Sequence, residues 1–290
     1  MKSARPELLN TPVVQYFGLK REPFSDKLKA SELCELPSVR EIASIVEMVV
    51  QNHYHFAFTG VTGCGKSTIL RYVCDRQERL GNRIVMANGG AWGFGEFLRQ
   101  IMMGLGIDFK AFQPSTMIRL IQNQIRTLRD DGKQVVIAVD ESDKLRNDVF
   151  QQLHLLVSSP DSGEALAPLV LSGQESLADK LVNPLATPLR SRMYPGYYVS
   201  AINRQTYRSY VQHHMDLCGM RADVVDDLAL EHIWKASSGN LRSIGMNFRI
   251  AIQYAANHDL PRLDAASLKV AFTDWWSIAQ TGAETPGLMR

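Results

Sequence analysis

Residues 60–67 read Gly-Val-Thr-Gly-Cys-Gly-Lys-Ser, and this stretch decides the fold class. It fits the spacing GxxxxGK(S/T) without a gap, between a strand-like segment at 55–59 and a helical pattern from Ser67 to about Leu80. Glycines let backbone N–H groups turn inward around phosphate oxygens, and the N-terminus of the next helix adds partial positive charge. We therefore predict a phosphate-binding loop. Its predicted nucleotide-binding residues are Gly60, Thr62, Gly63, Cys64, Gly65, Lys66, Ser67 and Thr68.

The side chains of this loop have different expected roles. Lys66 is expected to reach the β- and γ-phosphates of a nucleotide, and the Ser67 hydroxyl is expected to bind Mg²⁺. Cys64 lies inside the loop and is interpreted as a space-filling residue rather than a nucleophile. The chain has four cysteines without a CxxC pair, which argues against a zinc site or a disulfide framework.

A second motif follows the continuous apolar run at 135–139, which is typical of a parallel strand buried on both faces. Asp140 and Glu141 come directly after it, at the edge of an open α/β sheet where ligands bind. We predict that Asp140 binds Mg²⁺ or its water and that Glu141 activates the attacking water. The alternative is a solvated acidic turn, because residues 142–144 continue the polar run.

Polar and basic residues follow the next strand-like segment. Ser172 and Gln174 leave the strand at 169–171, and either could contact a terminal phosphate or the water. Arg190 and Arg192 precede the last short strand at 197–199, where they could pair with carboxylates or enter a neighbouring subunit's nucleotide site. In the helical part, Gly239-Asn240 predicts that one helix stops and another starts, which places Arg242 in a first turn.

The order of these patterns predicts the architecture. Five strands alternating with helices indicate a parallel α/β sheet, and only helical periodicity remains after about residue 202. We therefore expect four parts: an N-terminal arm, an α/β domain, a small all-helical domain and a tail. Their expected bounds are 1–37, 38–201, 202–279 and 280–290.

Composition limits the class of protein. The chain has 290 residues, 45% of them hydrophobic and 21% charged, so wholesale disorder is excluded. The formal net charge of +2 is too small to argue nucleic-acid binding by itself. The N-terminus lacks the apolar stretch of a signal peptide, and no run approaches 18 apolar residues. We expect a cytoplasmic protein without a membrane segment.

Taken together, these motifs resemble the AAA+ ATPases, and within them the ExeA-like group. Its N-terminal element is similar to Tyr16-Phe17-Gly18-Leu19 and the Pro23-Phe24 that follows. The resemblance implies a P-loop domain with a helical lid, and ATP with Mg²⁺ as the nucleotide and cofactor. It also implies that Arg192, or Arg190 as second choice, is an arginine finger, that Arg242 is the sensor-2 arginine, and that Ser172 or Gln174 is sensor 1.

The ExeA-like group contains two kinds of protein. The first is the secretion or cell-wall ATPase, which usually continues into further domains. The second is the stand-alone ATPase of mobile elements, similar to TniB, TnsC, IstB and MuB, and the chain length of 290 residues favours this kind. It implies duplex DNA, a transposase or related protein, and further copies of the chain in a ring or helical oligomer as partners. A small-molecule P-loop kinase is the alternative from another class.

Basic and polar residues between positions 110 and 129 are the residues in this sequence that bear on DNA binding. Arg119, Gln122, Arg126 and Arg129 recur at helical spacing and could form a basic-polar stripe, or an ordinary solvated helix face. Trp92 stands among glycines and could be an exposed contact or part of the core. The expected DNA contacts are Lys110, Gln113, Thr116 and Arg119.

Overall fold

The computed structural model describes residues 12–25, 28–108, 113–158 and 165–272. The chain divides into two compact units. One unit comprises residues 35–200, and the other combines the segment up to Cys34 with the segment from Ala201 onward. Lys110, predicted above to contact DNA, lies outside the described residues.

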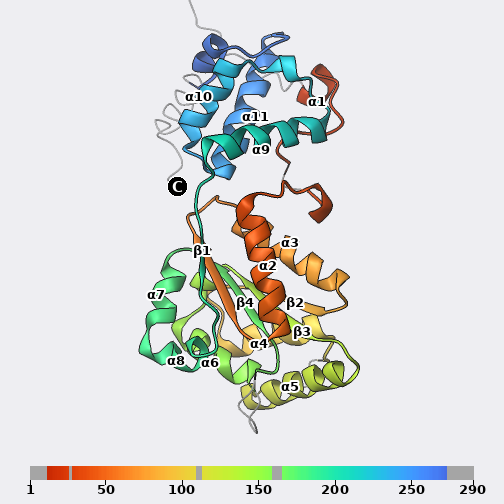
Figure 1. Ribbon diagram of the computed structural model, residues 1–290, viewed down its shortest axis with the longest axis vertical. Coiled ribbons are helices and arrows are strands. Elements are labelled where there is room, and N and C mark those ends of the chain that lie inside the picture. Colours follow the sequence, from red (N-terminus) through yellow and green to blue (C-terminus); the bar gives the residue numbers. More distant parts are fainter. Residues whose placement is uncertain (1–11, 26–27, 109–112, 159–164, 273–290) are drawn as a thin grey trace, which may run out of the picture. The chain divides into compact units, whose positions relative to one another are not determined.

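A five-stranded parallel sheet forms the centre of the first unit, with strand order β2-β3-β4-β1-β5 (Figure 1). This confirms the predicted α/β class with five parallel strands. Strands β3 and β4 lie inside the sheet, which explains why nearly every residue in them is apolar and buried. The strands are β1 (Phe56–Gly60), β2 (Arg83–Asn88), β3 (Val135–Asp140), β4 (Leu169–Gly173) and β5 (Tyr197–Val199).

Helices cover both faces of this sheet, with α2 and α3 in front of it in Figure 1 and α4 behind. The core on the α4 side contains Phe97 and Ile101 of α4, Met117 and Ile121 of α5, and Ile137 of β3, all buried. The sequence patterns did not predict α7 and α8, because seven and four residues are too few for a helical repeat to stand out. The α-helices are α2 (Pro37–Gln51), α3 (Lys66–Arg79), α4 (Phe94–Leu105), α5 (Pro114–Asp130), α6 (Asn147–Val157), α7 (Ser176–Val182) and α8 (Thr187–Arg190), and the 3₁₀ turns are η2 (Ser142–Lys144) and η3 (Pro184–Ala186).

The second unit is helical and contains α9 (Arg204–Cys218), η4 (Ala222–Val224), α10 (Asp227–Ser237) and α11 (Leu241–Asn257), followed by helical residues 265–272. Apolar residues that recur along these helices, such as Ile233 and Phe248, form its core. Each long helix begins at a side-chain cap, since Asn203, Asp226 and Asn240 accept hydrogen bonds from backbone N–H groups of the first turn.

The N-terminal segment, expected as an arm, is grouped with this helical unit and contains α1 (Val13–Tyr16) and η1 (Ala30–Glu32). Leu19 and Phe24 are buried in the helical core, and the Phe24 ring stacks on His214 with 4.4 Å between ring centroids. The Lys20 backbone N–H also donates to the Cys218 carbonyl at 2.8 Å. The aromatic element Tyr16–Phe24 therefore anchors the beginning of the chain to the helices that follow Ala201.

Candidate functional site: a nucleotide-binding edge of the sheet

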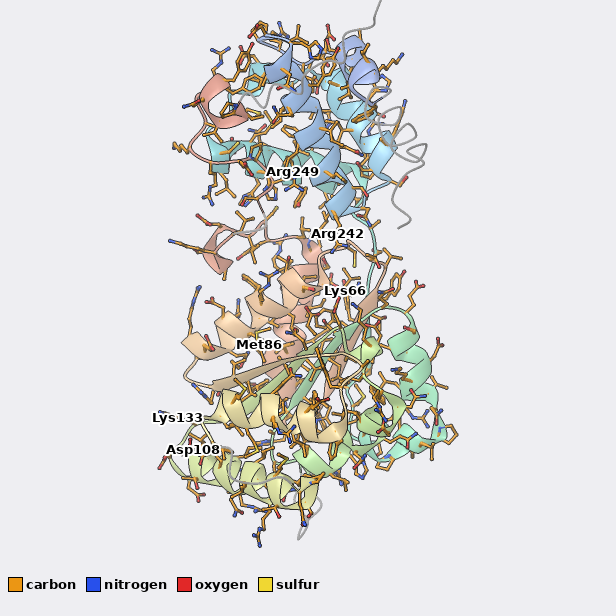
Figure 2. The ribbon with its side chains drawn as sticks, turned by 180° about the vertical axis from the view of Figure 1, so that it is seen from behind. Lys66, Met86, Asp108, Lys133, Arg242 and Arg249 are labelled. Atoms are coloured by element: carbon orange, nitrogen blue, oxygen red, sulfur yellow. The ribbon has the colours of Figure 1, made fainter. Side chains whose placement is uncertain are left out.

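The phosphate-binding loop joins the end of β1 to the start of α3, where Figure 2 labels Lys66. Gly63 and Gly65 have φ values of +84° and +95°, which residues with a side chain rarely adopt. The Lys66 ammonium lies over the loop and donates to the carbonyls of Gly60 and Val61, each at 2.8 Å. Backbone N–H groups, a helix N-terminus and a cation thus converge here, as the binding of a phosphate chain requires.

Cys64 sits within this loop as a buried side chain. Its Sγ lies 3.9 Å from the Lys66 Nζ, but burial raises the pKa of the thiol above its ordinary value. A raised pKa disfavours the thiolate, which is the reactive form of cysteine. The environment therefore fits a space-filling residue rather than a nucleophile.

Asp140 ends β3 at the same edge of the sheet. Its Oδ1 accepts hydrogen bonds from the Glu141 backbone N–H at 2.9 Å and from the Ser172 hydroxyl. The Asp140 carbonyl accepts from the Gly89 N–H at 2.6 Å, which fixes the loop after β2 against the end of β3. Ser172 is fully buried behind the Asp140 carboxylate, so its hydroxyl is engaged in orienting that group.

Glu141 has the left-handed backbone conformation, with a φ of +49°. Such a conformation is uncommon for a residue with a side chain, and it is often found at functional sites. The Glu141 carboxylate forms an ion pair with the Lys144 ammonium at 2.7 Å, and about half of each side chain is exposed. The carboxylate is therefore accessible to solvent and to a ligand at this edge.

Strand order brings the motifs together. Strand β4 lies between β1 and β3, with Thr59 opposite Gly173 and Val139 opposite Leu171. The end of β4 is therefore between the phosphate-binding loop and Asp140. Gln174, the next residue, is exposed there. The structure thus places the predicted residues of the loop, of β3 and of β4 at one edge of the sheet.

We expect that Glu141→Gln retains ATP binding but slows turnover by about 10²-fold or more, because a general base contributes about that factor. The substitution removes the proton acceptor while the backbone and the size of the side chain stay the same. Single-turnover hydrolysis and equilibrium nucleotide binding measure the two effects separately. Glu78→Gln, an exposed glutamate on α3, is the control. Normal turnover in Glu141→Gln would remove Glu141 from this role.

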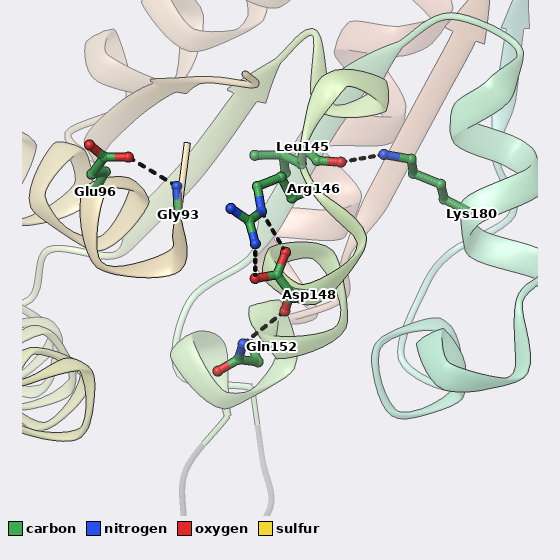
Figure 3. Close-up of polar contacts among 7 residues, drawn as sticks. All are labelled: Gly93, Glu96, Leu145, Arg146, Asp148, Gln152 and Lys180. Carbon is green, nitrogen blue, oxygen red and sulfur yellow. Dashed lines mark hydrogen bonds and ion pairs between the residues drawn. The ribbon is translucent and has the colours of Figure 1, made fainter. Parts of the chain in front are cut away.

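Residues 142–144, part of a polar run in the sequence, and the Leu145 that follows contact the site closely. Ser142 is fully buried, and its hydroxyl donates to the Ser172 carbonyl at 2.7 Å. Lys180 of α7 donates to the Leu145 carbonyl (Figure 3). The signal available in the sequence was a polar run directly after a strand, at the edge where ligands bind. The burial of Ser142 excludes a turn that is merely solvated.

Arg192 lies at the opposite end of β1 from the phosphate-binding loop. Its carbonyl accepts from the His55 backbone N–H at 3.0 Å, just before β1 begins, and its guanidinium donates to the Ser158 hydroxyl. Five strand residues separate the two ends, which corresponds to roughly 16 Å at about 3.3 Å per residue. Arg192 is therefore too far away to contact a nucleotide in its own subunit.

Two neighbouring groups complete this end of the unit. Arg190 is exposed, and its guanidinium donates to the carbonyls of Leu181 and Val182 at 3.4 and 3.0 Å. Burial, and secondarily the charge of Arg192, lowers the pKa of His55 to about 4. His55 is therefore neutral near pH 7, and its Nδ1 accepts from the Leu169 N–H at 3.2 Å, which ties the starts of β1 and β4 together.

In the helical unit, Arg242 is in the first turn of α11, as the Gly-Asn pattern predicted (Figure 2). The Asn240 side chain caps this helix by accepting from the Ser243 N–H at 3.1 Å. Ile202 donates to the Gly239 carbonyl at 3.0 Å, which fixes the turn to the segment after β5. Arg242 is exposed.

The predicted DNA-binding residues on α5 have different environments. Arg119 and Arg129 are exposed, Gln113 precedes the first turn, and Thr116 is half-buried. Gln122 is buried and donates to the Leu155 carbonyl at 2.8 Å, so the prediction that it belongs to an exposed stripe is wrong. Gln122 has the same helical spacing in the sequence as the arginines, but the packing of α5 on α6 buries its side chain. Trp92 is 43% exposed after β2.

The residues at the phosphate-binding edge fit a magnesium nucleotide. Ser67 lies in the first turn of α3, and Asp140 presents its carboxylate at the neighbouring strand end. Mg²⁺ commonly binds to one or two protein oxygens together with phosphates and water, so it needs no cluster of acidic residues. The described part of the chain holds no group of three or more His, Cys, Asp or Glu residues suited to a metal ion.

Comparison with known proteins agrees with this geometry. Residues 50–181 match the family of AAA domains, a region that includes the phosphate-binding loop and Asp140-Glu141. General secretion pathway protein A of Aeromonas hydrophila is 24% identical over 277 residues. The match covers 95% of this chain, but the chain spans only 50% of the length of that relative.

Solved structures show the same fold. ORC2 of Aeropyrum pernix, in ADPNP and ADP complexes, has a TM-score of 0.67 at 14% identity over 88% of this chain and 72% of its own. The Drosophila ORC structure bound to DNA has a TM-score of 0.70 at 15% identity over 98% of this chain and 70% of its own. The fold is thus that of the AAA+ P-loop ATPases. The match to the secretion protein narrows the resemblance to the ExeA-like group.

No helix in the described ranges is long and apolar enough to cross a membrane. The expected similarity to transposition ATPases and the expected cytoplasmic location remain predictions.

Proposed function

We propose that this protein hydrolyses ATP as an oligomer. The observation that carries the proposal is the meeting of the phosphate-binding loop, Asp140-Glu141 and the end of β4 at one edge of the sheet. Arg192 lies at the other end of β1, and we propose that it meets the nucleotide of a second subunit. A site with one half on each subunit is complete only in an assembly.

The residues would share the work as follows. Lys66 and the loop N–H groups would bind the phosphates, and Ser67 and Asp140 would hold Mg²⁺, which would supply neutralising charge. Glu141 accepts a proton from the water whose oxygen attacks the γ-phosphorus. The bond between that phosphorus and the bridging oxygen breaks, which leaves ADP and phosphate. Arg192 of one subunit would stabilise the charge that develops on its neighbour's nucleotide.

At the finer level, we propose that the oligomer binds duplex DNA and regulates transposition by selecting targets or activating a transposase. Two observations support DNA as a partner. Arg119 and Arg129 of α5 are exposed and have no acidic partner among the residues that the structure describes. In addition, a protein with the same fold, the Drosophila ORC, was solved bound to DNA. Lys110, Gln113 and Thr116 would extend this contact.

We expect that ATP or a non-hydrolysable analogue drives binding to duplex DNA with little sequence preference. Each subunit would touch few phosphates, so affinity should require an oligomer and should fall steeply with salt. Replacing Arg119 and Arg129 by Ala should weaken binding uniformly across sequences and lower the salt slope by about one per lost phosphate contact. Fluorescence anisotropy of a random duplex at two salt concentrations, with and without nucleotide, measures this.

Arg40→Ala is the matched control, because Arg40 is an exposed arginine on α2 rather than α5. It should leave DNA binding and its salt dependence unchanged. A failure to bind DNA at micromolar protein, low salt and saturating nucleotide would contradict the DNA proposal. It would leave the ATPase proposal intact, since hydrolysis is measured without DNA.

The second candidate is an ATPase that energises secretion or envelope assembly. The similarity to general secretion pathway protein A, over 95% of this chain, favours it. The phosphate-binding edge serves both candidates equally, so ATP hydrolysis does not separate them. Nucleotide-dependent DNA binding favours transposition, whereas hydrolysis without DNA binding favours secretion.

A further inference from the structure

Two hydrogen bonds connect the turn η2, directly after Asp140-Glu141, to the end of β4. The Ser142 hydroxyl donates to the Ser172 carbonyl at 2.7 Å. The Asp143 Oδ1 accepts from the backbone N–H of Gln174 at 3.0 Å. One side-chain oxygen of η2 therefore fixes the backbone at the residue where β4 leaves the sheet.

The two segments touch closely at Gly173. A Cβ atom at that position would lie 2.8 Å from the Asp143 Oδ1 and 3.1 Å from the Asp143 backbone nitrogen. Real Cβ atoms essentially never approach other atoms within 3.0 Å, so a side chain at this position would displace the Asp143 carboxylate from where it lies. The position of the Asp143 carboxylate relative to Gln174 is thus set by packing as well as by hydrogen bonding.

The two polar residues near the end of β4 differ in what they can still contact. The Ser172 hydroxyl is buried and engaged with Asp140. The Gln174 side chain is exposed, and it leaves the backbone at the point that Asp143 holds, between the phosphate-binding loop and Asp140. A carboxamide can donate to a phosphate oxygen and accept from a water molecule.

We propose that Asp143 is a positioning residue for ATP hydrolysis: through its hydrogen bond to the Gln174 N–H, it orients the Gln174 carboxamide toward the terminal phosphate or the attacking water. This inference rests on the proposed ATPase function. The Gln174 N–H needs an oxygen acceptor at the right place, and the charge of Asp143 is secondary. The proposed role of Asp143 therefore depends on where its side-chain oxygen lies.

The test compares two conservative variants of the full-length protein. Asp143→Asn removes the charge but keeps an oxygen that accepts from the Gln174 N–H, so kcat should stay within about 3-fold of wild type. Asp143→Glu keeps the charge but moves the carboxylate oxygens by one methylene, away from the position at which Oδ1 accepts from the Gln174 N–H. Its kcat should fall by about 10-fold or more, with nucleotide affinity nearly unchanged. Thermal unfolding confirms that both variants are folded.

Asp148→Ala is the matched control. Asp148 is an exposed aspartate five residues further along the chain, paired with Arg146 at 2.9 Å (Figure 3). Its removal changes the net charge of the same surface but breaks no contact to β4. It should leave kcat and nucleotide affinity unchanged.

A double-mutant cycle shows whether Asp143 acts through Gln174. Gln174→Ala should itself lower kcat, and adding Asp143→Glu should cause no further loss, because the group being positioned is already gone. The inference is overturned if Asp143→Asn is as slow as Asp143→Glu, or if the two losses multiply in the double variant. If the wild-type oligomer hydrolyses no ATP, the proposed ATPase function itself fails. If the wild type hydrolyses ATP normally but one of these two results is obtained, only the proposed role of Asp143 is rejected.

Discussion

Arg192→Ala is expected to leave ATP binding by the isolated subunit nearly intact and to lower hydrolysis by about 10³-fold or more. The reason is the position of Arg192 at the amino end of β1, roughly 16 Å from the loop that binds its own subunit's phosphates. An arginine that acts on a neighbour's γ-phosphate contributes to the rate without contributing to binding by a single subunit. Steady-state hydrolysis and equilibrium binding of a fluorescent nucleotide measure the two quantities.

Mixing variants tests whether the arginine acts between subunits. Arg192→Ala subunits bind nucleotide but lack the arginine, and Lys66→Ala subunits keep the arginine but lack a key nucleotide contact. A mixture should recover part of the activity, because each variant supplies what the other lacks. A mixture that stays inactive at concentrations at which the wild type assembles would contradict this assignment.

Two controls separate the arginine's charge from its local contacts. Ser158→Ala removes the hydrogen bond from the Arg192 guanidinium but leaves the charge in place, so it should retain hydrolysis. Arg190→Ala tests the second candidate, whose guanidinium contacts the carbonyls at the end of α7. If Arg190→Ala shows the large loss and Arg192→Ala does not, the finger is Arg190.

Lys66→Ala is expected to remove most ATP binding at nucleotide concentrations that just saturate the wild type. The Lys66 ammonium is held over the loop by the carbonyls of Gly60 and Val61, where the phosphate charge would lie. Truncating one partner of a close charge pair costs about 2–5 kcal/mol, which corresponds to a loss of about 30-fold to several thousand-fold in affinity. Isothermal titration calorimetry with ATP and Mg²⁺ measures it.

Arg79→Ala is the matched control for this substitution. Arg79 is at the far end of the same helix, α3, and pairs with Asp75 on the surface. It removes one positive charge without changing the phosphate-binding loop, so ATP affinity should stay the same. Wild-type affinity in a folded Lys66→Ala protein would exclude this loop as the nucleotide site.

The sequence predicted the local structure around the two main motifs correctly. The glycine pattern of residues 60–67 predicts a loop between a strand and a helix, and β1 and α3 flank it as expected. The apolar run before Asp140 predicts a buried strand, and β3 is buried along its length up to that residue. These features are readable because backbone conformation and strand burial depend on residues close together in the chain.

Only the tertiary structure decided which of these parts meet. Ser172 contacts Asp140 because β4 pairs with β3, and Gln122 is buried because α5 packs on α6. Asp143 reaches Gln174, which is 31 positions away in the chain, and Arg192 pairs with the residue before β1. Periodicity reports whether a residue is on an apolar or a polar face, but not which partner lies against that face. Strand order and helix packing determine the partners, and they depend on contacts between residues far apart in the chain.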